Sequence, residues 1–129
     1  MKVYQAIRSR RTVRDYKPDP IPQKLIKKIL QCARWSPSSS NTQKWSFIAI
    51  QDRDTLSKLG GICKQGPFVG QAPFAVAVVM DDAPRPQLDA GRAIQSMELM
   101  AWSEGVGMCF VGVRDEDQVV AVKSLLNIP

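Results

Sequence analysis

The strongest constraint on the fold is an amphipathic helix that leads directly into a polar loop and then into an apolar strand. Over residues 22–35 apolar side chains recur every three or four positions, and lysines and an arginine occupy the opposite face. Pro22 suits the first turn of such a helix. Residues 46–51 are apolar and short enough to be a strand. A helix and a strand joined this closely share a core, which predicts an α/β or α+β sandwich.

The remaining elements continue this alternation of helices and strands. Residues 74–80 form a continuous apolar, valine-rich run that is typical of a fully buried central strand. Gly60 and Gly61 are placed to end a short helix. Asp115, with Gln118 three residues later, predicts a capping box at the start of the last helix. The other predicted elements are helices at 1–8, 54–59, 88–105 and 116–126 and a strand at 108–113.

The length of the chain predicts one domain over residues 1–129, large enough to bury a core. Apolar residues at helical spacing mark the side chains expected in that core. Val3 and Ile7 are expected to face inward from the first helix, and Met97 and Ala101 from the long one.

Charge is distributed unevenly along the chain. Residues 1–45 carry eleven Lys and Arg against two Asp, a net charge of +9, and the remainder carries −3. A basic N-terminal third indicates an anionic ligand. Nucleic acid is one candidate, but no RNA-binding or zinc-finger motif is present and the basic residues are not interleaved with aromatics. A phosphorylated small molecule needs fewer charges, and the arginines of residues 8–14 are clustered closely enough to bind one.

Several classes of chemistry are disfavoured by the composition. The chain has no histidine, which removes histidine acid–base catalysis and the commonest metal ligand. Cys32, Cys63 and Cys109 are odd in number and widely spaced, so neither a disulfide framework nor a zinc site is expected. No apolar run approaches the roughly 20 residues that span a bilayer, and no signal-peptide pattern is present. We therefore expect a cytoplasmic protein that binds no metal ion and has neither a membrane nor a nucleic acid as a partner.

Two motifs flank the helix at residues 22–35. The first is RRTVRDY at residues 10–16, and the second is the polar loop of residues 35–45, in which four of the eleven positions are Ser. Proline and short polar side chains shape such a loop through local hydrogen bonds, and its hydroxyls and amides suit a polyhydroxylated, phosphorylated ligand. Composition alone favours an ordinary helix-to-strand connection. The arginine-rich motif upstream shifts the balance toward a binding site.

These two motifs, together with Ala72-Pro73 before a strand and GVGMCFVG at residues 105–112, resemble the nitroreductase family over almost the whole chain. The resemblance implies an α+β fold, a three-layer α/β/α sandwich of the FMN-dependent nitroreductase-like type. It also implies a homodimer that holds FMN in a cleft at the dimer interface. The implied activity moves two electrons from NAD(P)H through flavin N5 to a nitroaromatic, quinone or related acceptor. In that chemistry the flavin, and no side chain, is the catalytic group.

Carried over residue by residue, the resemblance implies ten flavin-binding positions. They are, in chain order, Arg10, Arg11, Thr12, Arg14, Pro37, Ser38, Ser39, Asn41, Phe110 and Gly112. The first four would hold the phosphate, the ribityl chain and the pyrimidine edge, because arginine offers forked donors to anions. The next four would approach the flavin from the partner subunit. Phe110 would lie against one face of the ring, and the Gly112 backbone N–H would point at N5.

The chain departs from the family pattern in three places. Lys44 stands where the family usually has Pro, and Thr12 replaces the more common Ser. Family members also continue past the position of Pro129 into a strand that joins the partner's sheet and then to a basic residue at the phosphate. This last departure predicts a truncated product or a fragment. It also leaves an alternative function open, a flavin-binding or regulatory module without turnover.

Overall fold

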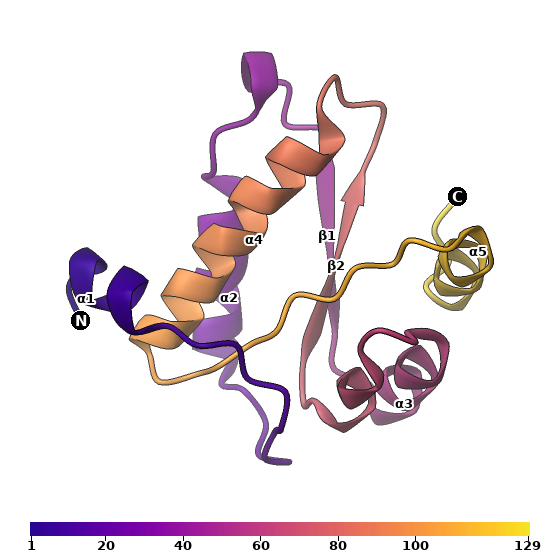
Figure 1. Ribbon diagram of the computed structural model, residues 1–129, viewed down its shortest axis with the longest axis horizontal. Coiled ribbons are helices and arrows are strands. Elements are labelled where there is room, and N and C mark those ends of the chain that lie inside the picture. Colours follow the sequence, from indigo (N-terminus) through magenta and orange to yellow (C-terminus); the bar gives the residue numbers. More distant parts are fainter. The chain divides into compact units, whose positions relative to one another are not determined.

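A computed structural model describes residues 1–129. Helices and two strands follow one another along the chain (Figure 1), as expected for an α+β fold. The elements are α1 (Val3–Ser9), α2 (Gln23–Arg34), η1 (Ser39–Asn41), β1 (Trp45–Ile50), α3 (Arg53–Ile62), η2 (Pro67–Gln71), β2 (Ala75–Met80), α4 (Pro86–Ser103) and α5 (Glu116–Leu125). None of the helices combines the length and the apolar character needed to cross a membrane.

The chain folds into two compact units, each assembled from segments that are distant in sequence. The first consists of Met1–Val13, Ile21–Ile48 and Val76–Met108, and the second of Arg14–Pro20, Ala49–Ala75 and Cys109–Pro129. The first unit holds α1, α2, η1, α4 and most of both strands, and the second holds α3, η2 and α5. The expectation of one domain over the whole chain stays a prediction.

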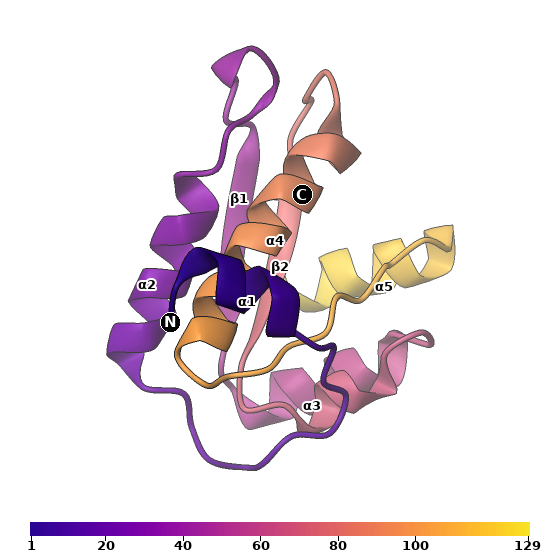
Figure 2. The ribbon, with the colours of Figure 1, turned by 60° about the vertical axis from the view of Figure 1, so that its left-hand side comes forward.

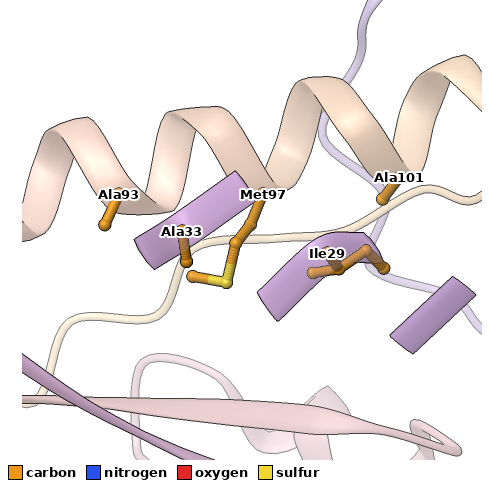
Figure 3. Close-up of a cluster of buried hydrophobic side chains, with 5 residues drawn as sticks. All are labelled: Ile29, Ala33, Ala93, Met97 and Ala101. Carbon is orange, nitrogen blue, oxygen red and sulfur yellow. The ribbon is translucent and has the colours of Figure 1, made fainter. Parts of the chain in front are cut away.

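The core of the first unit lies between α2 and α4, which run side by side (Figures 1 and 2). The apolar stripe predicted for α2 is buried at Ile26, Ile29 and Ala33. Figure 3 shows the Met97 side chain reaching from α4 toward Ile29 and Ala33. Small side chains at this contact let the two helices approach closely, and apolar burial contributes about 25 cal/mol per Å².

β1 and β2 form a two-stranded sheet beside this core. The backbone N–H of Asp81, just after β2, donates to the carbonyl oxygen of Lys44, just before β1, at 2.7 Å. The strands are therefore antiparallel. Trp45 and Phe47 from β1 pack against the helical core, as do alternate valines of β2. The prediction that residues 74–80 form a fully buried central strand is wrong: every residue of β2 is half-buried, because β1 is its only partner strand.

In the second unit, α3 begins and continues differently from the prediction. Asp52 caps it, since its carboxylate accepts from the Thr55 backbone N–H at 2.9 Å and from Thr55 Oγ1 at 2.7 Å. Gly60 and its glycine neighbour do not end the helix, which continues to Ile62. A Cβ at Gly60 would lie 2.5 Å from the Gly70 backbone nitrogen. Gly60 thus serves the close contact between α3 and η2 and not a C-cap.

The start of α5 also corrects a prediction. Asp115 is the N-cap residue, but its side chain bonds no backbone N–H, so there is no capping box. Instead the Gln118 amide donates to Asp115 Oδ2 at 2.9 Å, and Gln118 Oε1 accepts from the Lys64 backbone N–H at 3.1 Å. The buried Gln118 side chain therefore joins α5 to the loop that follows α3.

Two further expectations are wrong. Val3 and Ile7 are 73% and 57% exposed, because the short helix α1 meets α4 along a narrow face and buries only Ala6. Residues 108–113 are not a strand, because a strand requires a ladder with a neighbour and the sheet contains β1 and β2 alone.

Candidate functional site

The arginine run, Arg10–Arg14, begins where α1 ends. The Arg11 side chain turns back onto that helix end, and its Nη1 donates to the carbonyl oxygens of Arg8, Ser9 and Arg10 at 3.3, 3.2 and 2.9 Å. A cation in this position satisfies carbonyl groups that the helix leaves without partners. Arg11 is thus oriented by the chain and is still exposed to solvent.

Arg10 is fixed by a different partner, Glu98 of α4. Its Nη1 lies 3.3 Å from Glu98 Oε2, and the two side chains are 35% and 11% exposed. Next to this pair, Trp102 Nε1 donates to Ser9 Oγ at 2.9 Å. Glu98 therefore offsets part of the positive charge of the run, and the two contacts attach the start of the run to α4.

The middle of the run is held by its backbone. The Val13 N–H donates to the Met108 carbonyl oxygen at 3.0 Å. A Cβ at Gly107 would lie 2.3 Å from Val13 Cγ2, so a side chain there would displace this part of the run. Thr12, between the two anchored positions, is exposed.

Arg14 and Tyr16 belong to the second unit. Arg14 is exposed and takes part in no ion pair. The Tyr16 ring is half-buried, with its centroid 6.2 Å from that of Phe68. Burial raises the pKa of Tyr16 to about 12, nearby Cys109 adds to the rise, and Arg14 opposes it. Tyr16 is therefore neutral at physiological pH.

The serine loop, Ser36–Gln43, carries an unusual backbone between α2 and β1. Ser40, Asn41 and Gln43 have φ values of 53°, 53° and 52°, in the left-handed region that non-glycine residues rarely adopt. Each such residue costs free energy, of order 1 kcal/mol, and persists only where surrounding contacts fix it. The loop therefore has a defined shape that its bonds must maintain.

Some of those bonds lie within the loop itself. The Gln43 backbone N–H donates to Ser38 Oγ at 3.0 Å, and Gln43 Nε2 donates to Asn41 Oδ1 at 2.8 Å. Thr42 Oγ1 donates to the Ser39 carbonyl oxygen at 2.9 Å. The short polar side chains that mark this stretch in the sequence thus shape its backbone, as predicted for such residues.

The other bonds connect the serine loop to α4. Asp89 Oδ1 accepts from the Ser39 backbone N–H at 2.9 Å and from Ser39 Oγ at 3.0 Å. At the start of the loop, Ser36 Oγ bonds Ser96 Oγ at 2.9 Å. Asp89 is completely buried, and its second oxygen, Oδ2, has no hydrogen-bond partner. A buried carboxylate thus holds the loop by one oxygen.

A cleft of about 430 Å³ lies in the second unit beside Phe110 and Gly112. Its lining is completed by Gln65, Val111, Arg114, Asp115 and Gln118. The Phe110 side chain is 60% exposed, which is high for a large apolar ring. The nearest atom to a Cβ built on Gly112 is Arg114 Nε at 3.5 Å, an ordinary contact distance, and Gly112 does not have a positive φ. Neither packing nor backbone conformation within the chain requires glycine at this position.

The ten predicted positions fall into separate groups. The first unit holds Arg10, Arg11, Thr12, Pro37, Ser38, Ser39 and Asn41, and the second holds Arg14, Phe110 and Gly112. Within the first unit, Arg10 is attached to Glu98 and Ser39 to Asp89, nine residues apart on α4. At 1.5 Å per residue this separation is about 13.5 Å along the helix. The start of the arginine run, at the end of α1, and the serine loop, which contains η1, thus lie toward opposite ends of the helix pair (Figure 1).

Asp89 and Glu98 are the site residues that sequence reasoning missed. A signal for Asp89 was present, because it continues the four-residue spacing of Ala93, Met97 and Ala101, all of which are buried on α4. An acidic residue at the helical spacing of a buried apolar stripe is expected to be buried as well, and a buried carboxylate needs a specific partner. Glu98 has no comparable signal in the sequence.

Solved structures of known proteins share this fold. An FMN-dependent nitroreductase from Clostridium difficile R20291 superposes with a TM-score of 0.87 at 27% identity, over 98% of this chain and 79% of the other. A candidate NADH dehydrogenase/NAD(P)H nitroreductase from Parabacteroides distasonis gives a TM-score of 0.93 at 27% identity, over 98% and 78%. The α+β fold of FMN-dependent nitroreductases is thereby confirmed.

Sequence comparison leads to the same class. The sequence model of the nitroreductase family matches residues 7–85 and 64–129. A candidate NADH dehydrogenase/NAD(P)H nitroreductase from Methanothermobacter thermautotrophicus is 34% identical over 135 residues, covering all of this chain and 71% of the relative. The chain belongs to the nitroreductase family and is an oxidoreductase of that type.

Proposed function

We propose that the chain is an FMN-dependent oxidoreductase that takes two electrons from NAD(P)H and delivers them to a small acceptor, a nitroaromatic, a quinone or a related compound. FMN and NAD(P)H are the cofactors in the names of the C. difficile and M. thermautotrophicus relatives. When bound, FMN would supply the redox chemistry, accepting a hydride at N5 and passing its electrons to the acceptor.

The observation that carries the proposal is that nothing within the chain requires a glycine at Gly112, which lines a cleft beside Phe110. Gly60 and Gly107 have an internal reason in their close contacts with Gly70 and Val13. Gly112, like Gly61 and Gly91, has none, and of these three it is the one that lies beside the exposed ring of Phe110 in a cleft. A backbone kept bare beside an unpaired aromatic ring suits close approach by a flat ring system.

The arginine run fits the anionic parts of the same ligand. Arg11 and Arg14 are exposed, and Arg11 is already oriented by its bonds to the end of α1. Guanidinium groups bind phosphate through paired donors, and a cation near a flavin pyrimidine edge stabilises negative charge there. The Thr12 hydroxyl, exposed between them, offers a donor and an acceptor to a ribityl hydroxyl.

We further propose a homodimer in which each flavin is bound by both chains. The family resemblance assigns the arginine run and the serine loop to flavins of opposite subunits, and within one chain Arg10 and Ser39 are anchored about 13.5 Å apart along α4. The exposed apolar side chains of Val3, Tyr4 and Ile7 on α1 are also suited to a partner surface. Sedimentation analysis should show a dimer at micromolar concentration. A monomer with full flavin occupancy would contradict this part of the proposal.

Absorbance spectroscopy tests the redox function directly. Protein saturated with FMN should show the visible absorbance of bound oxidised flavin. Addition of NADH or NADPH without oxygen should abolish this absorbance. Addition of a nitroaromatic or a quinone should then restore the oxidised spectrum. Bound flavin that neither nucleotide reduces would contradict the proposed activity.

Substitution of Gly112 tests the site. Because the chain has room for a methyl group there, Gly112→Ala should change the free energy of unfolding of the flavin-free protein by no more than about 0.5 kcal/mol. It should nevertheless weaken FMN binding at least tenfold, ~1.4 kcal/mol, and Gly112→Val should weaken it further. Gly61→Ala is the matched control, since nothing lies within 4 Å of its added Cβ. Equal FMN affinity for Gly112→Ala and Gly61→Ala would contradict the assignment of Gly112 to the flavin-binding site.

A further inference from the structure

The attachment of the serine loop to α4 rests on a single buried carboxylate. Asp89 is 0% exposed, and its Oδ1 accepts both the backbone N–H and the hydroxyl of Ser39. Hydrogen bonds to a charged acceptor are typically the strongest that neutral donors make. Asp89 therefore fixes both the main chain and the side chain of Ser39.

The position of this anchor matters because of the backbone that follows it. Ser40 and Asn41, the next two residues, are left-handed, and so is Gln43. Residues in this region return to ordinary conformations unless neighbouring contacts prevent it. The two hydrogen bonds from Ser39 to Asp89, at the start of the left-handed segment, supply such a contact.

Fold stability alone gives little reason for a carboxylate here. Asp89 Oδ2 is buried without a hydrogen-bond partner, and an unpaired buried acceptor destabilises a protein. The loop is also attached to α4 by the hydrogen bond between the Ser36 and Ser96 hydroxyl groups. That bond involves no charged group and does not carry the free-energy cost of a buried, unpaired carboxylate oxygen. Sites where local cost is retained are often those where function requires one geometry.

We propose that Asp89 is a positioning residue that presets the serine loop for flavin binding by fixing Ser39. It does not touch the ligand, and it acts by holding Ser38, Ser39 and Asn41 in the arrangement that the ligand meets. The inference rests on the proposed FMN function, because it assigns the loop to the flavin. Presetting lowers the ordering cost at the moment of binding, so its loss appears as weaker binding.

Two substitutions separate positioning from general stability. Asp89→Ala removes the acceptor for both Ser39 donors, and FMN binding, followed by flavin fluorescence, should become at least tenfold weaker. Asp89→Asn keeps a carbonyl oxygen of the same reach without the charge, so it should weaken FMN binding less than Asp89→Ala does. Met97→Ala is the control, since it opens the core of the first unit without touching the loop. It should lower the melting temperature and leave FMN affinity unchanged.

A flavin-free measurement tests the anchor by itself. Amide hydrogen exchange at Ser39 in the apo protein should be faster in Asp89→Ala than in Met97→Ala, even where the two melt at the same temperature. If Asp89→Ala does not fold, Asp89→Asn and Ser39→Ala carry the test. Ser39→Ala loses one of the two bonds, and amide exchange at this position in the flavin-free protein should be faster than in wild type, a readout that does not depend on contact with FMN.

The outcomes are distinguishable. Wild-type protein that binds no FMN would overturn the proposed function and this inference with it. Wild-type protein that binds FMN, with an Asp89→Ala variant of equal affinity or with Ser39 exchange unchanged, would overturn this inference alone. A loss of FMN affinity in Met97→Ala as large as in Asp89→Ala would mean that Asp89 acts only through the general stability of the core, and it would also overturn this inference.

Discussion

The arginine run and the serine loop carry polar side chains assigned to the same ligand, but the chain fixes them to different degrees. In the loop, Ser39 is bonded twice to Asp89, and Thr42 and Gln43 bond other loop residues. In the run, bonds hold the inner part, and Arg14 at its end is exposed and without an ion pair. One region is shaped before a ligand arrives, and the other keeps its outer cation available.

This difference shows how binding groups of two kinds are prepared. Hydroxyls and amides bind weakly one at a time, so they contribute only when several are held in one geometry. A guanidinium interacts over a longer range and tolerates some freedom, because much of its attraction does not depend on direction. Substitutions in the loop should therefore act through geometry, and those at the end of the run through charge.

The largest effect is expected at the exposed end of the run. Arg14→Ala should weaken FMN binding by about 1.5–3 kcal/mol, at least tenfold, because it removes a charge-assisted hydrogen bond. Lys17→Ala removes the same charge from another exposed position of the second unit and serves as the control. Affinity is measured by fluorescence titration, and reduction by NADPH in stopped flow. Equal losses from the two variants would mean that general electrostatic attraction binds the ligand.

An effect on stability is expected in the anchored middle of the run. Gly107→Ala should lower the free energy of unfolding by about 1–3 kcal/mol, because the new methyl group would lie 2.3 Å from Val13 Cγ2. Gly91→Ala, in α4 with nothing within 4 Å, should instead raise stability by about 0.5–1 kcal/mol. Urea unfolding compares the two. Similar midpoints for both variants would show that the run is not held against Gly107.

The smallest effect concerns pH. The pKa of Tyr16 is raised from 10.0 to about 12, chiefly by burial, so the unfolded chain releases this proton first as the pH rises. The contribution of Tyr16 to the free energy of unfolding is complete below pH 10 and is lost between pH 10 and about 12. For a half-buried group this loss amounts to about 1 kcal/mol. Thermal melts across this range should therefore show a smaller decline for Tyr16→Phe than for wild type. Tyr4→Phe, at a residue 72% exposed, should decline as wild type does.

Much of the fold follows from periodicity, and the exceptions have physical causes. The stripe of α2 was predictable because Ile26, Ile29 and Ala33 satisfy one helical period and one core. The burial of β2 was not, because an apolar run does not reveal how many strands lie beside it. Gly60 was misassigned as a helix end because its role is a tertiary contact with Gly70, which leaves no local signature.

The site divides in the same way. Residue types and spacing identify the arginine run and the serine loop as candidates, and a family resemblance supplies their roles. The partners Glu98 and Asp89 lie 88 and 50 residues away from Arg10 and Ser39, so no local pattern connects them. Only the register of Asp89 with the buried positions of α4 gave a sequence clue.

The indole groups give the chain a built-in optical reporter. Trp35 and Trp45 stand at the two ends of the serine loop, the first 75% exposed and the second half-buried against the Phe47 ring, 5.8 Å away. Trp102, whose Nε1 is bonded to Ser9, emits from a site remote from the loop. With Trp102 replaced by Phe, intrinsic emission would come from the two loop-flanking indoles alone. Loop rearrangement would then be visible in real time without any added dye.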